Sequence, residues 1–286
     1  MADVRDDDDD DGGRTLRASI LIDPERPKVK REEVLRILAA AGIQVARSRP
    51  DVGVVVGGDG IFSDYGRRIS TTPLLFVGVR SAETTASRGY LAQVHVDRLP
   101  EALRDLKEGR FEVVEYRRLR VALNGVERGE VFTDVYLEKG ADSNCLRYHL
   151  DVRPREGRPF TDSAIANGVV ISTSAGSTGY YSYVDRVHDG DRLEPSHFTR
   201  FGPEEVGVCH IAPVLTARSG GTDLAPLRYT VPWGASFRLR LTRDADARLY
   251  GIVRSRRGIR VRTGDVIDVR PSASTTRVVR LSRASG

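Results

Sequence analysis

The residues best suited to chemistry in this sequence form a short segment, Gly57-Gly58-Asp59-Gly60, directly after a run of three valines. Glycines allow backbone N–H groups to approach phosphate oxygens closely, and turns of this kind bind anions. A helix starting at Gly60 would add the positive end of its dipole. Asp59 could then accept a hydroxyl proton or help to hold a magnesium ion. The segment predicts a phosphate site beside a carboxylate; the alternative is a tight turn in which Asp59 merely caps a helix.

A second segment rich in glycine and hydroxyl groups runs from residue 172 to residue 180, with the sequence STSAGSTGY. The apolar residues 168–171 precede it as a predicted strand, and Tyr180 and Tyr181 close it. A flexible linker is the alternative, but such a linker rarely stands between a strand and an aromatic pair. We interpret the segment as a ligand-binding loop. The two loops together favour a kinase.

Several other catalytic and nucleotide-binding patterns are missing from the sequence. It contains neither G-x-x-x-x-G-K-[ST] nor G-x-G-x-x-G, so it predicts neither a Walker-type nor a Rossmann nucleotide site. Ser177 lies in no G-x-S-x-G motif, which argues against a hydrolase. Cys145 and Cys209 stand in no cysteine–histidine cluster, so a zinc site is not expected. Asp134 and His210, taken singly, are best interpreted as structural residues of β segments.

The composition is that of an ordinary folded domain, with 286 residues, 40% hydrophobic and 30% charged. The net charge of +5 is spread along the chain without a basic helix or stripe, so we expect no nucleic-acid partner. No apolar stretch is long enough to span a bilayer, and the first residues do not open a signal peptide. We therefore expect a cytoplasmic protein without a membrane partner. The run of aspartates at positions 6–11 predicts a disordered acidic tail over residues 1–14.

The first third of the chain alternates predicted strands and helices around the segment that contains Asp59. Strands are expected at residues 16–22, 43–46, 51–56 and 73–79, and helices at residues 32–41, 60–69 and 100–109. Such alternation indicates a parallel sheet with crossover helices. The continuous β-branched run before Gly57 is typical of a strand buried on both faces. Asp59 then lies at the carboxyl end of that strand, where open α/β sheets bind ligands.

The pattern changes near residue 110. Short strand-like segments follow, separated by turn residues, at 111–123, 131–138, 146–152, 168–173, 237–242 and 259–261. No long helix is expected among them. The sequence therefore predicts an α/β domain with a parallel sheet over residues 15–110 and an all-β, β-sandwich-like domain over residues 111–286.

These segments, in this order, resemble the NAD kinase family. That family carries a GGDG motif in an α/β domain, an asparagine–acid pair on an early strand of a β domain, a long glycine loop and a segment of the I-A-P type. The matching residues here are Gly57-Gly58-Asp59-Gly60, Thr133-Asp134, residues 167–180, and His210-Ile211-Ala212-Pro213. The resemblance covers roughly residues 15 to 275. The GGDG motif alone is also found in diacylglycerol-kinase-like and phosphofructokinase-like families.

The resemblance implies a role for each matching residue. Asp59 would be the base that activates the 2′-hydroxyl of the adenosine ribose of NAD, and the backbone of Gly57, Gly58 and Gly60 would hold the phosphates of ATP. The implied NAD-binding residues of the β-rich domain are Thr133, Asp134, Asn167, Thr178, Gly179, Tyr180 and Tyr183, together with Asp59 and Gly60 of the first domain. Magnesium, or another divalent cation, would arrive with ATP, without a stable protein-bound metal site. The family usually forms homo-oligomers, so a dimer or tetramer is expected.

The chain also departs from the family pattern at several pocket positions. Thr133 replaces the usual asparagine, Asn167 replaces the aspartate that opens the long loop, and Arg80 replaces a usual asparagine. Ile61 follows GGDG in place of threonine, and Tyr250-Gly251 stands where a late Asp-Gly is expected. The prediction is an NAD kinase that uses ATP or polyphosphate. Two alternatives stay open: a GGDG-type kinase of a lipid or other small acceptor, and a non-catalytic dinucleotide-binding regulatory homologue.

Overall fold

The structure is a computed structural model that describes residues 15–23, 29–79, 89–141, 143–188, 198–219, 224–253 and 257–282, apart from the side chain of His188. The expected acidic tail over residues 1–14 and the substituted position Arg80 lie outside the described residues.

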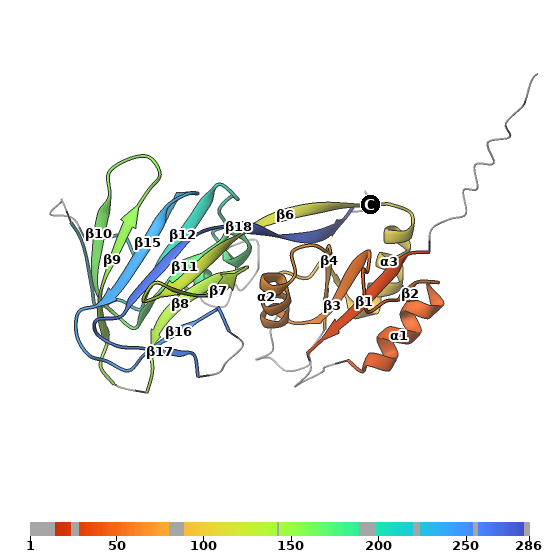
Figure 1. Cartoon of the computed structure of the whole chain (residues 1–286), viewed down its shortest axis with the longest axis horizontal. Coiled ribbons are helices and arrows are strands. Elements are labelled where there is room, and N and C mark those ends of the chain that lie inside the picture. The colour runs from red at the N-terminus through yellow and green to blue at the C-terminus, as the bar shows by residue number, and fades with distance from the viewer. Residues whose placement is uncertain are drawn as a thin grey trace, which may run out of the picture.

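The N-terminal part is a parallel sheet with helices on both faces (Figure 1). Its strands lie in the order β2-β1-β3-β4, with β5 beside β4. Its elements in chain order are β1 (Arg17–Ile22), α1 (Arg31–Ala40), β2 (Gln44–Val45), β3 (Val52–Gly57), α2 (Asp59–Arg68), β4 (Leu74–Gly78), β5 (Val94–His95) and α3 (Leu99–Lys107).

Burial explains why the two central strands contain almost only apolar residues and glycine. Every residue of β3 and of β4 is buried. Helices α1 and α3 cover one face of these strands, where Leu38 and Leu103 pack with Val54 and Val56. Helix α2 covers the other face, where Phe62 stacks on Phe76 with ring centroids 4.8 Å apart. The start of α2, and with it Asp59, is thereby fixed at the carboxyl end of β3.

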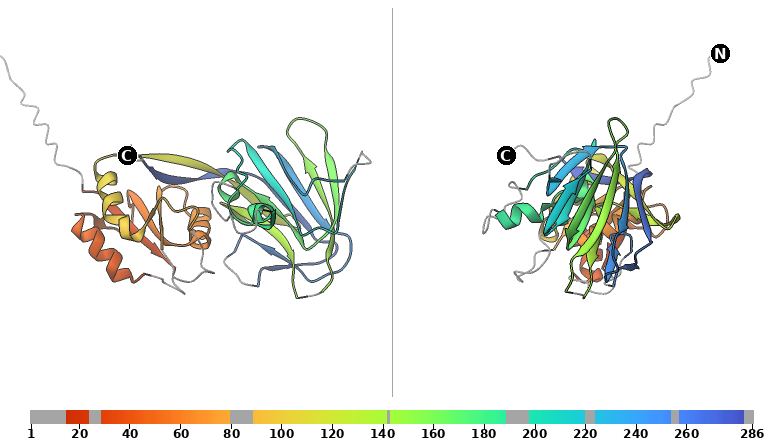
Figure 2. Two further views of the ribbon diagram at one scale, coloured as in Figure 1. Left: turned by 180° about the vertical axis from the view of Figure 1, so that it is seen from behind. Right: turned by 90° about the vertical axis from the view of Figure 1, so that its left-hand side faces the viewer.

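The C-terminal part consists of two packed sheets of mainly antiparallel strands (Figure 2). A six-stranded sheet has the order β14-β12-β11-β8-β16-β17, and the facing sheet runs β13-β10-β9-β15-β18, with β6 on β18 and β7 on β6. One apolar core fills the space between them. The strands are β6 (Phe111–Leu123), β7 (Val126–Val131), β8 (Asp134–Lys139), β9 (Leu146–Arg153), β10 (Phe160–Ala166), β11 (Gly168–Ser172), β12 (Glu205–Ile211), β13 (Leu215–Arg218), β14 (Arg228–Pro232), β15 (Ser236–Leu241), β16 (Ala247–Tyr250), β17 (Ile259–Val261) and β18 (Val266–Leu281). A short helix, α4 (Tyr183–His188), follows the glycine loop.

Two long strands join the parts. β6 and β18 pair antiparallel from Leu123 opposite Ile267 to Phe111 opposite Leu281, with a register shift between Pro271 and Thr275 (Figure 1). Near its end β18 also pairs parallel with β4, so the last strand of the chain extends the first sheet. The boundary near residue 110 stays a prediction. Val278, Val279 and Leu281, from the end of the chain, pack into the cores of the N-terminal part.

The predicted fold class, a parallel α/β part followed by a β-sandwich-like part, is confirmed. The predicted strands and helices lie within a few residues of β1 to β4, α1 to α3, β6, β8, β9, β11, β15 and β17. The sequence analysis missed β18, whose polar central stretch, Ser272-Ala273-Ser274-Thr275-Thr276, lacks the apolar alternation of a strand. It also missed β7, β10, β12, β13, β14 and β16.

Two glycines of α2 provide a test of how this helix packs. A Cβ atom placed on Gly66 would lie 2.5 Å from a ring carbon of Phe132, whereas one placed on Gly60 would meet no atom within 4 Å. We predict that Gly66→Ala lowers the free energy of unfolding by about 1–3 kcal/mol through overpacking. Gly60→Ala should leave it within about 0.5 kcal/mol of the wild type. Urea unfolding of both variants measures the difference; equal stabilities would contradict the described contact between α2 and Phe132.

Candidate active site

A cavity of about 360 Å³ lies between α2 and the β-rich part. The start of α2, the residues around β8 and the turns that follow β11 form its walls. It brings together seven of the residues predicted from sequence, namely Asp59, Gly60, Thr133, Asp134, Thr178, Gly179 and Tyr180. Segments that are far apart in the chain thus meet at one site, as the order of the motifs suggested.

Asp59 is the first residue of α2, and Gly58 is its N-cap. Its carboxylate accepts hydrogen bonds from two backbone N–H groups of another segment, those of Tyr90 at 3.1 Å and Leu91 at 2.9 Å. Asp59 is therefore not the N-cap of α2, and its carboxylate bonds to another segment rather than to its own helix. The carboxylate instead ties the segment before β5 to the beginning of α2, and both Asp59 and Leu91 line the cavity.

Thr133 and Asp134 form the opposite wall at the start of β8. The hydroxyl groups of Thr133 and Ser63 lie 2.7 Å apart, so this wall is bonded directly to α2. Burial raises the pKa of Asp134 to about 6, although the N–H of Tyr180 and the hydroxyl of Thr133 act in the opposite direction. A carboxylate that is costly to ionise thus lies across the cavity from Asp59.

The glycine loop is compact. It forms two turns of 3₁₀ helix, Ser174–Gly176 and Tyr180–Ser182. A Cβ atom on Gly176 would overlap the carbonyl oxygen of Thr133, so glycine permits the close approach of loop and wall. Arg186 stabilises the loop by donating hydrogen bonds to the carbonyl oxygen of Thr178 at 2.9 Å and to the hydroxyl of Ser182 at 3.1 Å. This geometry excludes the flexible-linker alternative for the segment.

Aromatic rings line one end of the cavity. Tyr136 and Tyr180 reach it, with ring centroids 5.2 Å apart, and the ring of Tyr250 stacks on that of Tyr136 with centroids 5.1 Å apart. The hydroxyl of Tyr180 donates a hydrogen bond to Glu138 at 2.7 Å. Gly251 has a φ angle of 98°, which favours glycine, and any side chain there would overlap the backbone of Asp134. The Tyr250-Gly251 pair thus supports the same wall as Asp134.

Four of the predicted site residues lie outside the cavity walls. Gly57 and Gly58 precede α2 behind Asp59, and Asn167 lies at the far end of β11, because Ser172 is the residue of this strand that pairs with Asp134. Asn167 accepts a contact from the thiol of Cys145 at 3.6 Å. The hydroxyl of Tyr183 donates to the carbonyl oxygen of His210 at 2.6 Å and accepts from the N–H of Ala212. Ligand contacts by these residues stay predictions.

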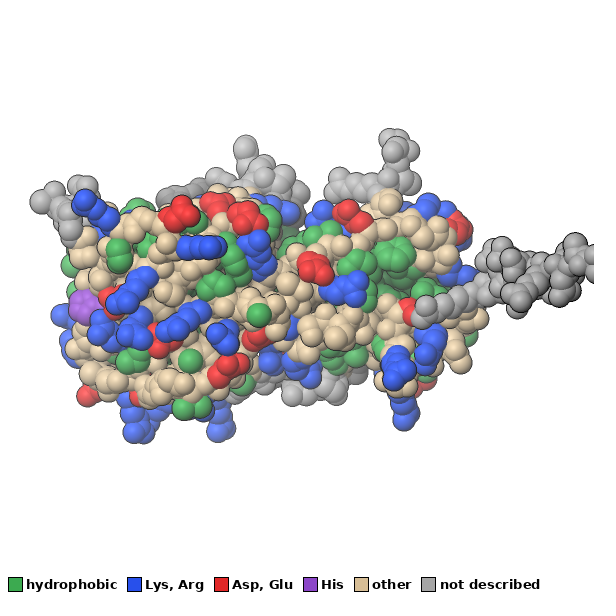
Figure 3. Space-filling view, turned by 45° about the horizontal axis from the view of Figure 1, so that its top comes forward, with side chains coloured by type: hydrophobic (Ala, Val, Ile, Leu, Met, Phe, Trp, Pro, Cys, Tyr) green, Lys and Arg blue, Asp and Glu red, His purple; other side chains and the backbone are tan. Residues whose placement is uncertain are grey.

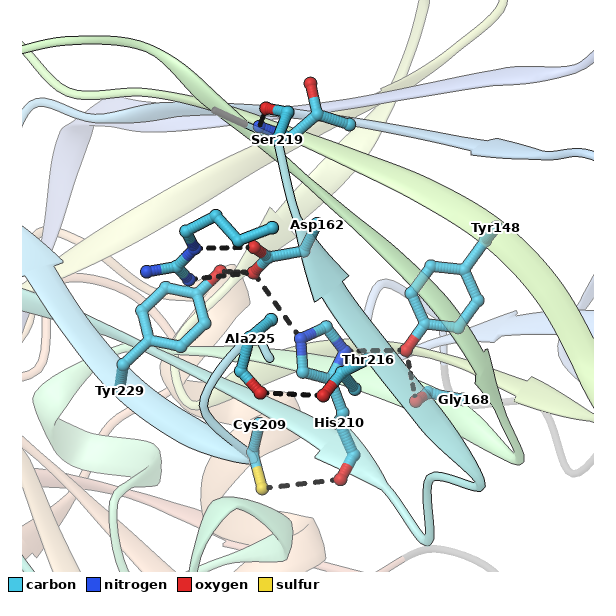
Figure 4. Close-up of polar contacts among 11 residues, drawn as sticks. Tyr148, Asp162, Gly168, Cys209, His210, Thr216, Ser219, Ala225 and Tyr229 are labelled. Atoms are coloured by element: carbon cyan, nitrogen blue, oxygen red, sulfur yellow. Dashed lines mark hydrogen bonds and ion pairs between the residues drawn. The ribbon is translucent and has the colours of Figure 1, made fainter. Parts of the chain in front are cut away.

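His210 belongs to a buried polar network of the β-rich part (Figure 4). It has no exposed surface, and its Nδ1 lies 2.8 Å from the hydroxyl of Tyr148, while its Nε2 lies 3.5 Å from the carboxylate of Asp162. Burial alone would raise the pKa of Asp162, but contacts with His210, Arg218 and Tyr229 outweigh it, and the pKa lies below its usual value. These bonds agree with a structural role for His210.

Three further features concern the described residues as a whole. Basic and acidic side chains are interspersed over both parts of the face in Figure 3. Among the described residues, no group of three or more His, Cys, Asp or Glu side chains is arranged to hold a metal ion. The helices that the structure describes include none that is both long and apolar enough to cross a bilayer.

Comparisons with known proteins agree with this geometry. No protein-family model matches the chain. The chain is 30% identical over 233 residues to the NAD kinase of Geobacter sulfurreducens, a match that covers 80% of this chain and 72% of that protein. Seven further curated NAD kinases match over 44% to 51% of their own lengths.

Solved structures share the fold. A yeast NADH kinase complexed with NADH superposes with a TM-score of 0.67 at 15% identity, covering 94% of this chain and 84% of that chain. An NAD kinase from Archaeoglobus fulgidus in complex with ATP gives a TM-score of 0.60 at 16% identity, covering 92% of this chain and 93% of that one. Fold and site thus define a two-part kinase. The chain belongs to the NAD kinase family, as the motifs predicted.

The structure adds cavity residues that were not predicted from sequence, among them Ser63, Arg67, Leu91 and Tyr136. Ser63 and Arg67 lie one turn apart on α2, at the spacing that places side chains on one helix face. That spacing was visible in the sequence, but the sequence does not show which face of α2 meets the second part.

The raised pKa of Asp134 predicts how stability depends on pH. Its folded-state pKa of about 6 exceeds the reference value of 3.8, so between these values the unfolded chain releases the proton first. The contribution of Asp134 to the free energy of unfolding therefore falls as the pH rises from about 4 to about 6. We predict that Asp134→Asn removes this dependence and is more stable than the wild type at pH 7, by up to about 3 kcal/mol.

Urea unfolding between pH 4 and pH 7 checks this expectation. Asp185 is the matched control of opposite sign: burial alone would raise its pKa, but hydrogen bonds from Arg228 and Thr199 outweigh burial and lower it. Asp185→Asn should therefore lose stability at pH 7. A loss in both variants would show that Asp134 is stabilised as the anion, contrary to the prediction.

Proposed function

We propose that the protein is an NAD kinase that transfers a phosphoryl group from ATP, or from polyphosphate, to the 2′-hydroxyl of the adenosine ribose of NAD, giving NADP. The observation that carries this proposal is the cavity in which Asp59 of the GGDG segment meets the glycine loop and Asp134. Membership of the NAD kinase family supports the choice of acceptor and donor.

The proposed reaction needs one proton transfer and one phosphoryl transfer. The 2′-oxygen of the ribose forms a bond to the terminal phosphorus, the bond from that phosphorus to the bridging oxygen breaks, and ADP leaves with that oxygen. The 2′-hydroxyl proton goes to the Asp59 carboxylate. Such reactions depend chiefly on positioning and on stabilisation of charge. The two N–H bonds that Asp59 accepts hold its carboxylate in place for this purpose.

The remaining cavity residues would bind the acceptor. Gly60, with open space beside its Cα, lets a phosphate or ribose approach the N-terminal end of α2, where the helix dipole favours negative charge. Tyr136 and Tyr180 provide aromatic surface for the adenine, and Thr133 and Asp134 offer polar groups to the ribose or the base. Thr178 and Gly179 would complete this wall. We also propose that Asn167 and Tyr183 contact NAD.

A divalent cation, magnesium in the first instance, fits this arrangement as a companion of ATP. Magnesium usually takes one or two protein carboxylates, with phosphates and waters as the other ligands. The Asp59 carboxylate faces the cavity and could be such a ligand, with the backbone of Gly57, Gly58 and Gly60 near the phosphates. The cation would neutralise charge on the transferring phosphoryl group. Cytoplasmic location and assembly as a dimer or tetramer also stay part of the proposal.

The two alternative functions differ from this proposal in their products. A kinase of a lipid or another small acceptor would leave NAD unphosphorylated, and a regulatory homologue would bind the dinucleotide without turnover. We predict that the purified protein forms NADP from NAD with magnesium and either ATP or polyphosphate, as measured by a coupled NADP-specific dehydrogenase assay. NAD binding without product under every donor would support the regulatory alternative instead.

A second prediction concerns Asp59. Asp59→Asn should reduce kcat by about 10²–10⁴-fold, because a positioned general base typically contributes that much. The amide keeps one acceptor, so one of the two N–H bonds to the segment before β5 is also lost. Equilibrium binding of NAD, measured alongside kcat, separates the two effects. Asp268→Asn, which removes an exposed ion pair with Arg238 on β15, is the control. Unchanged kcat in Asp59→Asn would mean that Asp59 only positions the segment.

A further inference from the structure

One side chain of the short helix after the glycine loop contacts two different segments of the candidate active site. Arg186 lies on α4, and its Nη2 donates to the carbonyl oxygens of Thr178 at 2.9 Å and of Gly179 at 3.5 Å. Both of these loop residues line the cavity. The guanidinium group also lies over two aromatic rings, with its carbon 5.0 Å from the ring centroid of Phe198 and 5.9 Å from that of Tyr90. Arg186 thus contacts the loop and two rings from other segments.

Tyr90 connects these contacts to Asp59. Its ring packs edge-to-face on that of the buried Phe198, with centroids 5.3 Å apart. Its backbone N–H donates to the Asp59 carboxylate at 3.1 Å. Two contacts in series therefore lead from Arg186 to the carboxylate proposed as the general base, namely the ring contact with Tyr90 and the hydrogen bond from the N–H of Tyr90.

The contacts of Arg186 are of the kind that fix an orientation. The neighbouring carboxylate, Asp185, pairs with Arg228 at 2.7 Å rather than with Arg186. The Nε of Arg186 is buried and has no hydrogen-bond partner among the described residues. A guanidinium group is planar, so it can donate hydrogen bonds in its plane while its face lies against aromatic rings. The position of the loop relative to the two rings is therefore tied to the orientation of this one group.

We propose that Arg186 is a positioning residue for phosphoryl transfer. It holds the glycine loop against the rings of Tyr90 and Phe198, and it thereby sets the distance between the loop and Asp59. The acceptor hydroxyl, which the loop helps to place, is then aligned with the base that takes its proton. Arg186 does not line the cavity, so it acts through the loop and through Tyr90 rather than on a substrate. The proposal rests on the proposed function.

Steady-state kinetics of NADP formation by variants of the full chain test the proposal. Arg186→Ala should lower kcat about 10- to 100-fold, because a displacement of about 1 Å at a reacting centre can cost that much. The KM for NAD should stay within about threefold of the wild type, since the substitution removes no direct ligand contact. Arg186→Lys should recover part of kcat, because an ammonium group still donates to the loop carbonyls but does not stack on the rings.

Arg228→Ala is the matched control. Arg228 also holds α4, through Asp185, and its guanidinium carbon lies over the ring of Tyr181 at 5.2 Å, but it lines no part of the cavity. This variant should lose stability in urea unfolding and keep the kcat of the wild type. An equal loss of kcat in Arg228→Ala and Arg186→Ala would show a general loosening of α4 and overturn the proposal.

A double-mutant cycle tests the ring contact separately. Phe198→Leu removes a ring that both Arg186 and Tyr90 contact, and it leaves the donors of Arg186 to the loop in place. Because both substitutions break the same link, the double variant should lose less kcat than the product of the two single losses. Losses that multiply would contradict the link. If Arg186→Ala does not fold, Arg186→Lys and Phe198→Leu must each lower kcat at nearly constant KM for the proposal to stand.

Amide hydrogen exchange gives a readout that does not depend on activity. The N–H groups of Tyr90 and Leu91, which are bonded to Asp59, should exchange faster in Arg186→Ala than in the wild type and should be unchanged in Arg228→Ala. Unchanged exchange or unchanged kcat in Arg186→Ala would overturn the proposal, as would a raised KM at constant kcat. Failure of the proposed function would appear differently, as a wild-type protein that forms no NADP. Faster exchange at Tyr90 would even then support the link from Arg186 to Asp59.

Discussion

The long antiparallel pair of β6 and β18 is the constraint on which the candidate site depends. It joins two parts with separate cores, and its inner side chains also fix α2. Arg118 of β6, only 3% exposed, donates to the carbonyl oxygens of Arg67 and Ile69 at the end of α2 and to the hydroxyl of Thr276. Thr276 in turn donates to the carbonyl oxygen of Gly66. These bonds satisfy backbone acceptors that a helix end otherwise leaves free.

Because the C-terminal end of α2 is fixed, the position of its N-terminal end is fixed as well. Because the helix is held against β6 and β18, its first residue, Asp59, keeps a defined position relative to β8 and the glycine loop. The site then combines groups that are individually unfavourable for folding. Asp134 is a partly buried carboxylate with a raised pKa, and Asp64 is a buried carboxylate that Arg67 and Arg68 hold at 2.5 and 2.6 Å. Such groups are typical of sites shaped for ligands at some expense of stability.

Much of this arrangement could be predicted from the sequence. The parts that could not be predicted depend on contacts that only the folded chain makes. The strands β3 and β4 are continuous apolar runs, so their burial on both faces was evident, and the position of Asp59 followed from them. β18 could not be recognised, because its polar stretch faces residues of β6 that only the fold brings close. Asp162 on β10 is fully buried, yet a lone aspartate gives no sign that Arg218 will pair with its charge and that Tyr229 will donate a hydrogen bond to it. The cavity-facing side of α2 likewise depends on tertiary packing, so Ser63 and Arg67 were missed.

The pairing of β18 with β4 also bears on the order in which the molecule can be built during translation. Val278, Val279 and Leu281 fill the two cores on either side of the first sheet, although more than half of the chain separates them from it. Domains usually fold as units in the order of their synthesis. Here the N-terminal sheet is made first but is completed last, since its final strand leaves the ribosome only after the whole β-rich part. The nascent chain must therefore carry an unfinished α/β core, in which Leu74 of β4 lacks its partner Val278, through most of its synthesis.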